Sequence, residues 1–246
     1  MIRKSETQDA LVLSSSKFKD DSAIITLSGQ NGIFSLYARG IYKPKSPLKP
    51  LLIVGNFVSV EYKVSQNGPG FASSLKVIED ASLLHQDYKS NCFLLLLQEL
   101  SLSLFRYGDA FPQEEVMRLI FKLQDHGDSL SLALLLLGIF YKRFGLNIQT
   151  KECVVCHKSD HIVSYSLQEG GFLCQNCCND LHKECFNEMD LYVLKFASSP
   201  LTDDILNKKV PQESGVNVFL SLLENLILYF DLKPLRCLPL FLQAIQ

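Results

Sequence analysis

Residues 23–38 read AIITLSGQNGIFSLYA, and this stretch decides the fold of the N-terminal region. Two runs rich in β-branched and aromatic residues flank a polar segment with two glycines at 28–32, which is typical of two strands joined by a turn. A similar apolar run precedes them at 10–13, and residues 57–64 alternate apolar with polar side chains. With a further run at 71–78, the first 80 or so residues predict a small, partly open β-barrel.

Beyond Leu83 the sequence changes to leucine-rich segments with the lengths of helices. Capping residues and an N-terminal proline mark where these helices should start. The expected starts are Asp87 or Ser90, Pro112, Asp128 or Ser129, Asp190 and Ser214. A cysteine-bearing insert at about 150–187 interrupts this helical region. We therefore expect an α+β multidomain protein, with a barrel at 1–80 and a helical domain at 81–246 that carries the insert.

Length and composition limit the function classes. The chain has 246 residues, of which 47% are hydrophobic and 20% charged, enough to bury the cores of two ordinary domains. Its formal net charge of −2 provides no general attraction to nucleic acid or to an anionic membrane. The start lacks the apolar core of an export signal, and the apolar runs are too short to span a membrane. We expect a cytoplasmic protein with reduced thiols and no membrane partner.

The cysteine pattern is the strongest chemical signal. Cys153 and Cys156 form one C-x₂-C pair, and Cys174 and Cys177 form a second after an intervening segment at 157–173. This spacing matches structural zinc sites, in which two tight turns present four thiolates to one tetrahedral ion. Four protein ligands leave no position for an activated water. The pattern therefore predicts one structural Zn²⁺ per chain held by these four cysteines.

Alternatives to this ligand set remain at the level of sequence. Free thiols or a redox pair are the other interpretation of a C-x-x-C motif. Cys178 stands next to Cys177, and either of the two could be the fourth ligand. Three histidines near the motif offer nitrogen ligands, at positions His157, His161 and His182. Cys92 and Cys237 lie in apolar contexts and are expected to be buried, whereas the pattern assigns no place to Cys185.

A local basic segment stands out against the near-neutral whole. No acidic residue occurs between Asp21 and Glu61, whereas four cations do. These cations are Arg39, Lys43, Lys45 and Lys49, and Tyr37 and Tyr42 lie beside them. Cations that follow phosphates and aromatic faces that stack on bases are the components of single-strand binding sites. A solvated connecting loop is the alternative interpretation of the same residues.

The motifs of common enzymes are absent from the sequence. It contains no G-x-x-x-x-G-K-[ST], G-x-G-x-x-G, H-E-x-x-H or G-x-S-x-G pattern, and it lacks the paired motifs of zinc deaminases. We therefore expect a protein that is not an enzyme.

Six segments together resemble a known family, the bacterial RecO proteins, which are recombination mediators of DNA repair. The segments follow in the same order along the chain and combine barrel, basic loop and cysteine insert. They are ALVLSS at 10–15, GIFSLYARG at 32–40, LKPLL at 48–52, YKRFGL at 141–146, CVVC at 153–156 and GGFLCQNC at 170–177.

The resemblance implies an N-terminal OB-fold and a helical C-terminal domain with a four-cysteine zinc site. It implies binding and annealing of single- and double-stranded DNA, and work with RecR to load RecA on DNA covered by single-strand-binding protein. It also implies association with the nucleoid during repair. On this basis the four loop cations become phosphate contacts.

A second hypothesis from another class is a zinc-stabilised protein–protein adaptor whose nucleic-acid binding is incidental. A zinc-dependent hydrolase is a third, and it requires a metal with an open coordination position.

Overall fold

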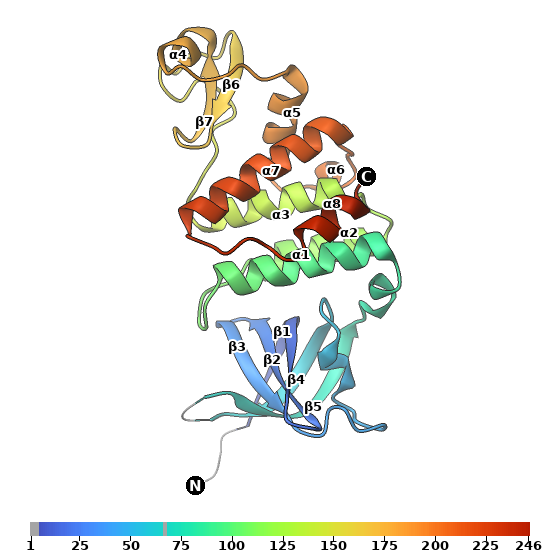
Figure 1. The fold of residues 1–246 in the computed structure, drawn as a ribbon. Coiled ribbons are helices and arrows are strands. Elements are labelled where there is room, and N and C mark those ends of the chain that lie inside the picture. The colour runs from blue at the N-terminus through green and yellow to red at the C-terminus, as the bar shows by residue number, and fades with distance from the viewer. Residues whose placement is uncertain (1–4, 66–67) are drawn as a thin grey trace. The chain divides into compact units, whose positions relative to one another are not determined.

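A computed structural model of the protein describes residues 5–65 and 68–246 (Figure 1). The chain divides into two compact units. The first ends at Gln124 and takes in Leu235–Ala244, and the second comprises 125–234 with the last two residues. The last barrel strand ends at Glu79, next to the domain boundary expected near residue 80. That residues 1–80 and 81–246 are separate domains remains a prediction.

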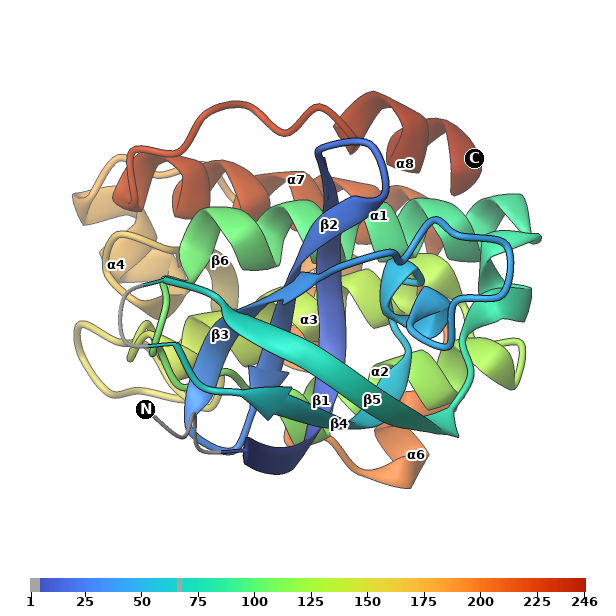
Figure 2. The same ribbon diagram turned by 90° about the horizontal axis from the view of Figure 1, so that it is seen from below.

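Five strands of the first unit, among the described residues, close into a barrel. They are β1 (Ser5–Phe18), β2 (Ser22–Gly29), β3 (Gly32–Ala38), β4 (Phe57–Lys63) and β5 (Gly70–Glu79). Neighbouring strands are antiparallel except β3 and β5, whose short parallel pairing completes the order β1-β2-β3-β5-β4 (Figure 2). The barrel is therefore closed, whereas the sequence predicted a partly open one. The difference arises because Leu36 and Tyr37 pair with Gly70 and Phe71, a long-range contact that strand patterns do not report.

The turn quoted from the sequence forms as expected. Gly29 pairs with Gly32, which leaves Gln30 and Asn31 as the turn between β2 and β3. Gly32 has a φ of +99°, and a Cβ there would meet the carbonyl oxygens of the 108–109 segment at 2.6–2.7 Å. Glycine is required at this position because both the backbone conformation and the close approach exclude a side chain.

The barrel interior is filled by small and branched apolar side chains that alternate with outward-facing residues. In β4, Val58 and Val60 are fully buried, as the period-two pattern predicted. The other fully buried members of this core are Ala10, Val12, Ala23, Ile25, Leu27, Leu36, Ala38, Ile41 and Leu51. A short 3-10 helix, η1 (Lys49–Leu52), contributes the last of these.

Three α-helices and a 3-10 helix complete the first unit. They are η2 (Ser82–His85), α1 (Tyr88–Leu104), α2 (Gln113–Gln124) and α8 (Leu238–Ala244). The Asp87 carboxylate accepts a hydrogen bond from the Ser90 backbone N–H, so Asp87, and not Ser90, is the N-cap of α1. Helix α8 packs against α1, and the Glu99 side chain of α1 accepts hydrogen bonds from the two backbone N–H groups that directly precede α8. The sequence patterns did not predict α8.

The second unit contains α3 (Ser129–Arg143), α5 (Glu188–Ala197), α6 (Asp203–Leu206) and α7 (Gln212–Tyr229). Asp128 caps α3. Helix α3 packs against α5 and α7. A Cβ at Gly138 of α3 would lie 1.8 Å from the carbonyl oxygen of Ala197. Glycine at this position therefore allows α3 to approach the end of α5 closely. The α5 helix begins two residues before the expected Asp190, because Asn187 caps it.

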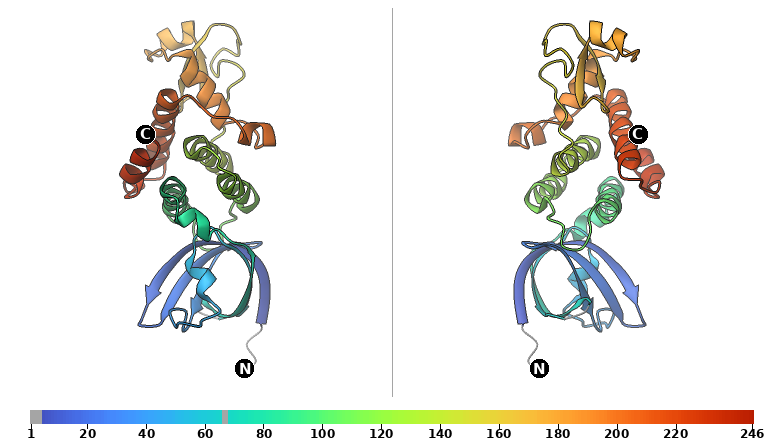
Figure 3. Two further views of the ribbon diagram at one scale, coloured as in Figure 1. Left: turned by 90° about the vertical axis from the view of Figure 1, so that its right-hand side faces the viewer. Right: turned by 90° about the vertical axis from the view of Figure 1, so that its left-hand side faces the viewer.

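The cysteine insert forms a small lobe of the second unit, coloured yellow to orange in Figure 3. It comprises the hairpin β6 (Ile162–Ser166) and β7 (Gly171–Cys174) followed directly by α4 (Gln175–Asp180). A Cβ at Gly171 would lie 2.1 Å from the Gln149 carbonyl oxygen, so the return of the hairpin over residue 149 requires glycine. The hairpin expected from the Gly170-Gly171 pair therefore forms.

Candidate functional site

Four cysteines of the insert converge on one point. Cys153 and Cys156 lie in a turn before β6, Cys174 ends β7, and Cys177 lies in the first turn of α4. Their Sγ atoms all lie within 4.8 Å of one another. The His157 backbone N–H donates to the Cys153 carbonyl oxygen over 2.9 Å and closes the first turn. The hairpin then brings the second pair of cysteines back to the first.

The spacing of the sulfurs fits a tetrahedral metal ion. Zinc–sulfur bonds of about 2.3 Å place the sulfurs of a tetrahedral ZnS₄ site about 3.8 Å apart. Cys156 Sγ and Cys174 Sγ, which belong to different pairs, are separated by 3.6 Å. A cage of four thiolates selects a soft or borderline cation such as Zn²⁺ and leaves no ligand position for substrate.

The thiols of the cluster differ in pKa, and therefore in how readily each becomes a thiolate. Burial acts to raise the pKa of Cys153, but backbone hydrogen bonds from Cys156 and Cys174 outweigh it and lower this pKa to about 6. Burial and the neighbouring Cys156 thiol raise the pKa of Cys177 to about 12. A cation that binds all four sulfurs therefore displaces protons from this cluster.

The other candidate ligands lie outside the four-sulfur group. Cys178 is buried, and its thiol donates to the Lys183 carbonyl oxygen over 3.2 Å. His157 contacts the Glu152 carboxylate at 3.2 Å, and the structure does not bring His161 or His182 into the group among its described residues. Cys185 is exposed near Gln175, and Cys92 and Cys237 are buried as expected. The geometry thus groups Cys177, and not Cys178, with the other three cysteines.

The basic loop connects β3 to η1 on the barrel. Arg39, Lys43, Lys45 and Lys49 are all exposed there, as is Tyr42. Lys43 Nζ lies 3.7 Å from Asp21 Oδ2, and Lys49 Nζ donates to the Pro44 carbonyl oxygen over 2.9 Å. Arg39 and Lys45 have no ion-pair partner within residues 5–65 and 68–246. Arg39 and Lys45 can therefore bind an anionic ligand without first giving up a contact such as those of Lys43 and Lys49.

Tyr37 lies apart from the loop tip and belongs to a row of rings. It is half-buried on β3, and its ring centroid lies 5.7 Å from those of both Phe18 and Phe71. Sequence reasoning named Tyr37 but missed both phenylalanines. Their signal was weak, because each is a single aromatic residue at the end of a strand.

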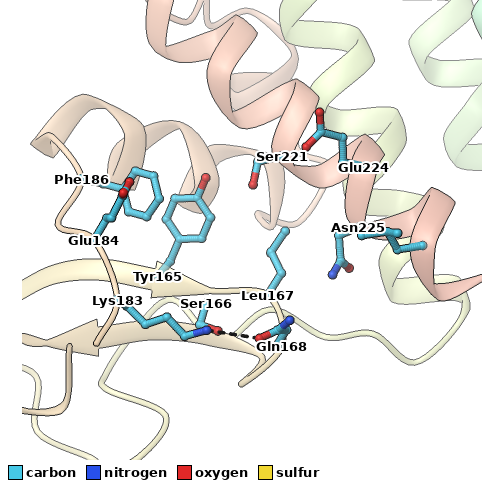
Figure 4. A pocket seen from close by; sticks show the side chains of 11 residues that line it. Tyr165, Ser166, Leu167, Gln168, Lys183, Glu184, Phe186, Ser221, Glu224 and Asn225 are labelled. Atoms are coloured by element: carbon cyan, nitrogen blue, oxygen red, sulfur yellow. Dashed lines mark hydrogen bonds between the residues drawn. The ribbon is translucent and has the colours of Figure 1, made fainter. Parts of the chain in front are cut away.

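A pocket of about 360 Å³ opens in the second unit between the β6–β7 hairpin and α7 (Figure 4). The stacked rings of Tyr165 and Phe186, with centroids 4.4 Å apart, form one side, and the Tyr165 hydroxyl is directed towards Ser221. Glu184 and Glu224 also line it. The rest of the described lining is mainly polar and includes Lys183, Gln168 and Asn225.

Over the described part of the chain, the helices are all too short or too polar to cross a bilayer.

Comparisons with known proteins agree with this architecture. The family model for the N-terminal part of recombination protein O matches residues 1–84, and the model for its C-terminal part matches 85–226. A DNA repair protein RecO of Lactobacillus acidophilus is 22% identical over 184 residues, which cover 73% of each chain. The RecO of Syntrophomonas wolfei is 23% identical over 171 residues, 68% of each chain. The RecO of Latilactobacillus sakei is 26% identical over 181 residues, 69% of this chain and 64% of its own. With a closed N-terminal barrel, leucine-rich helices and a four-cysteine cluster, this chain belongs to the RecO family of DNA repair proteins.

Proposed function

We propose that this protein is a non-enzymatic recombination mediator. It binds and anneals single- and double-stranded DNA in the cytoplasm, and with RecR it helps to load RecA on single strands coated by single-strand-binding protein. Family membership supports this role. The observation that carries it is the exposed loop of the barrel, in which Arg39 and Lys45 stand without ion-pair partners among the described residues.

Phosphate contacts explain how this loop acts. Residues 1–80 hold ten Lys or Arg against seven Asp or Glu, a local charge of +3, although the whole chain carries −2. Arg39, Lys43, Lys45 and Lys49 bind phosphate oxygens, and Tyr37 and Tyr42 contact bases. Each neutralised phosphate releases condensed counterions, which provides affinity that falls as salt rises.

The four-cysteine cluster holds one structural Zn²⁺ per chain in this proposal. Cys153, Cys156, Cys174 and Cys177 are the ligands, and the ion contributes to folding of the insert, with no part in chemistry. Its role is to join the turn before β6 to the start of α4, two segments with few apolar side chains of their own. The insert therefore orders around the ion.

The test is a titration of a fluorescein-labelled oligo-dT with the zinc-loaded protein, followed by fluorescence anisotropy at two salt concentrations. We expect binding at 50 mM salt that weakens by at least about tenfold at 200 mM, as several phosphate contacts require. Binding that does not change with salt would overturn the assignment of the loop. Annealing of complementary strands, with and without RecR, then tests the mediator role.

A specific observation also favours the adaptor role for the second unit. Residues 153–190 hold two Lys against six Asp or Glu, a local charge of −4. Asp190 is buried and the other five acids are exposed, so the exposed charge of this segment is still negative, which repels phosphates and suits contact with protein. A complex with RecR that survives reversal of the loop charges, in a variant that no longer binds DNA, would identify protein binding as the primary activity.

A further inference from the structure

Three aromatic rings from three strands lie side by side on the barrel. They are Phe18 of β1, Tyr37 of β3 and Phe71 of β5, here called the aromatic row. Phe18 and Tyr37 meet edge to face at 5.7 Å and 86°, and Tyr37 and Phe71 do so at 5.7 Å and 82°. The meander β1-β2-β3 brings Phe18 near Tyr37, and the closing pair of β3 with β5 adds Phe71 from a distant part of the sequence.

The aromatic row lies on the outer face of the barrel. Leu36 and Ala38, on either side of Tyr37, are fully buried in the interior, so Tyr37 projects outward. Phe71 is the direct cross-strand partner of Tyr37, and paired residues share a face. The Phe18 side chain is 41% exposed at the end of β1. Tyr37 and Phe71 are half-buried, so Phe18 is the most exposed ring of the row and the other two add partly exposed apolar surface beside it.

Cations lie at both ends of the row. Lys19 Nζ is 5.5 Å from the centre of the Phe18 ring. At the other end, Lys63 of β4 is the cross-strand partner of Phe71 and is exposed. Arg39 follows Tyr37 by two residues and begins the basic loop. Single-stranded DNA has flat, apolar base faces and an anionic backbone. An aromatic surface with positive charge at each end is complementary to both.

We propose that the aromatic row is a base-stacking platform that gives the barrel a preference for single-stranded over duplex DNA. This inference rests on the proposed DNA-binding function and specifies its ligand. Only unpaired bases have faces open to protein rings, because duplex bases are stacked on one another. Cross-strand aromatic pairs also stabilise sheets. If the rings only stabilised the sheet, the protein would bind a DNA strand with bases and an abasic DNA strand equally well.

The protein contains no tryptophan, so a single introduced tryptophan reports on stacking without background. Phe18→Trp keeps an aromatic ring in the row. Tyr192→Trp on α5 is the matched control, because Tyr192 is 44% exposed and belongs to the second unit. Each variant is titrated with oligo-dT, with an abasic strand of equal length and with a duplex, while anisotropy of the labelled DNA measures binding.

We expect oligo-dT to quench the Phe18→Trp fluorescence and to leave Tyr192→Trp unchanged, and the abasic strand to bind more weakly without quenching. Equal affinity for the abasic strand and oligo-dT, or absence of quenching while oligo-dT binds, would overturn the stacking platform and leave DNA binding intact. Duplex binding as tight as single-strand binding would also overturn it. Failure of every DNA to bind at low salt would overturn the proposed function itself.

A second set of variants separates stacking from folding. Phe18→Ala and Phe18→Leu both remove the ring, but leucine keeps apolar contact with Tyr37. We expect each to weaken oligo-dT binding by about tenfold, the size of one stacking contact. Duplex binding should change by less than about twofold. If Phe18→Leu binds oligo-dT as tightly as the unmodified protein, the ring is not a stacking surface.

Discussion

Lys43 Nζ lies 3.7 Å from Asp21 Oδ2, so the acidic residue that precedes the long cationic stretch in the sequence folds back against it. Both side chains are exposed, at 69% and 46% respectively. The pair therefore contributes little to stability. Its effect is on the field of the loop, because Asp21 offsets one of the four positive charges where phosphates are proposed to bind.

Removal of this acid should strengthen DNA binding. We expect Asp21→Asn to bind oligo-dT about two- to threefold more tightly at low salt, with the gain lost at high salt as screening shortens the range of the interaction. Anisotropy titrations at the two salt concentrations measure it. Asp20→Asn is the control, since it makes the same charge change at the neighbouring exposed residue. Equal effects of both variants would assign the gain to net charge alone.

The loop cations should differ in their contribution to binding. Each lost phosphate contact should lower the slope of log affinity against log salt by about one unit. We expect Arg39→Gln and Lys45→Gln to show the full loss, because neither cation has an ion-pair partner in the described part of the chain. Lys43→Gln should lose less, since Asp21 already offsets its charge.

The control for these loop variants is Lys208→Gln in the second unit. Lys208 Nζ lies 2.9 Å from Asp204 in an exposed i,i+4 pair, and it belongs to a different unit from the loop. An identical slope for Lys45→Gln and the unmodified protein would exclude Lys45 as a phosphate contact.

Substitutions at two adjacent cysteines test which of them is the fourth metal ligand. Cys177→Ser should lose the bound zinc, because its sulfur belongs to the four-sulfur group. Cys178→Ser should keep about one zinc per chain, because this thiol donates to the Lys183 carbonyl oxygen instead. Zinc content by mass spectrometry of the purified proteins measures both. Retention of zinc by Cys177→Ser together with loss by Cys178→Ser would reverse the assignment.

The zinc ligands should affect stability more than DNA contacts. We expect Cys153→Ser and Cys174→Ser to lower the melting temperature and the soluble yield, because structural zinc contributes directly to folding free energy. Cys185→Ser is the control, since this exposed cysteine lies outside the four-sulfur group. Normal melting and zinc content in Cys153→Ser would contradict a structural site.

A half-buried carboxylate links α1 to the turn before α8 and should make stability depend on pH. The two Glu99 carboxylate oxygens accept the backbone N–H groups of Arg236 and Cys237, each over 2.9 Å. Burial acts to raise the pKa of Glu99, but these hydrogen bonds outweigh it and hold the pKa below its usual value of 4.5. Glu99→Gln should lower the free energy of unfolding by about 1–2 kcal/mol at pH 7, as loss of a cap does.

The sign of the pH effect follows from the lowered pKa. The carboxylate contributes its full stabilisation above about pH 4.5, and the contribution is lost as pH falls through the folded-state pKa. The difference between the original protein and Glu99→Gln, measured by urea unfolding, should therefore shrink below pH 4.5. A difference that stays constant from pH 7 to pH 3 would show that packing, and not charge, explains the loss.

Signals carried by neighbouring residues were readable from the sequence. The Gly29–Gly32 turn and the alternation in β4 predicted their strands, and Asp87 and Asp128 were among the expected helix caps. The two C-x₂-C pairs likewise predicted the four-sulfur cluster. Turns, strand alternation and caps are controlled by interactions over a few residues, and the cysteine pairs form a recognisable spacing, so the order of amino acids alone contains these signals.

Features that depend on long-range pairing were decided only by the tertiary structure. The parallel contact of β3 with β5 closed the barrel and placed Phe71 beside Tyr37. The return of the chain brought the turn before α8 to Glu99. The α4 turn likewise places the Cys177 sulfur, and not that of Cys178, with the other three cysteines, which the spacing in the sequence left open. Periodicity describes which face a side chain occupies, whereas its partner on that face depends on how distant segments pack.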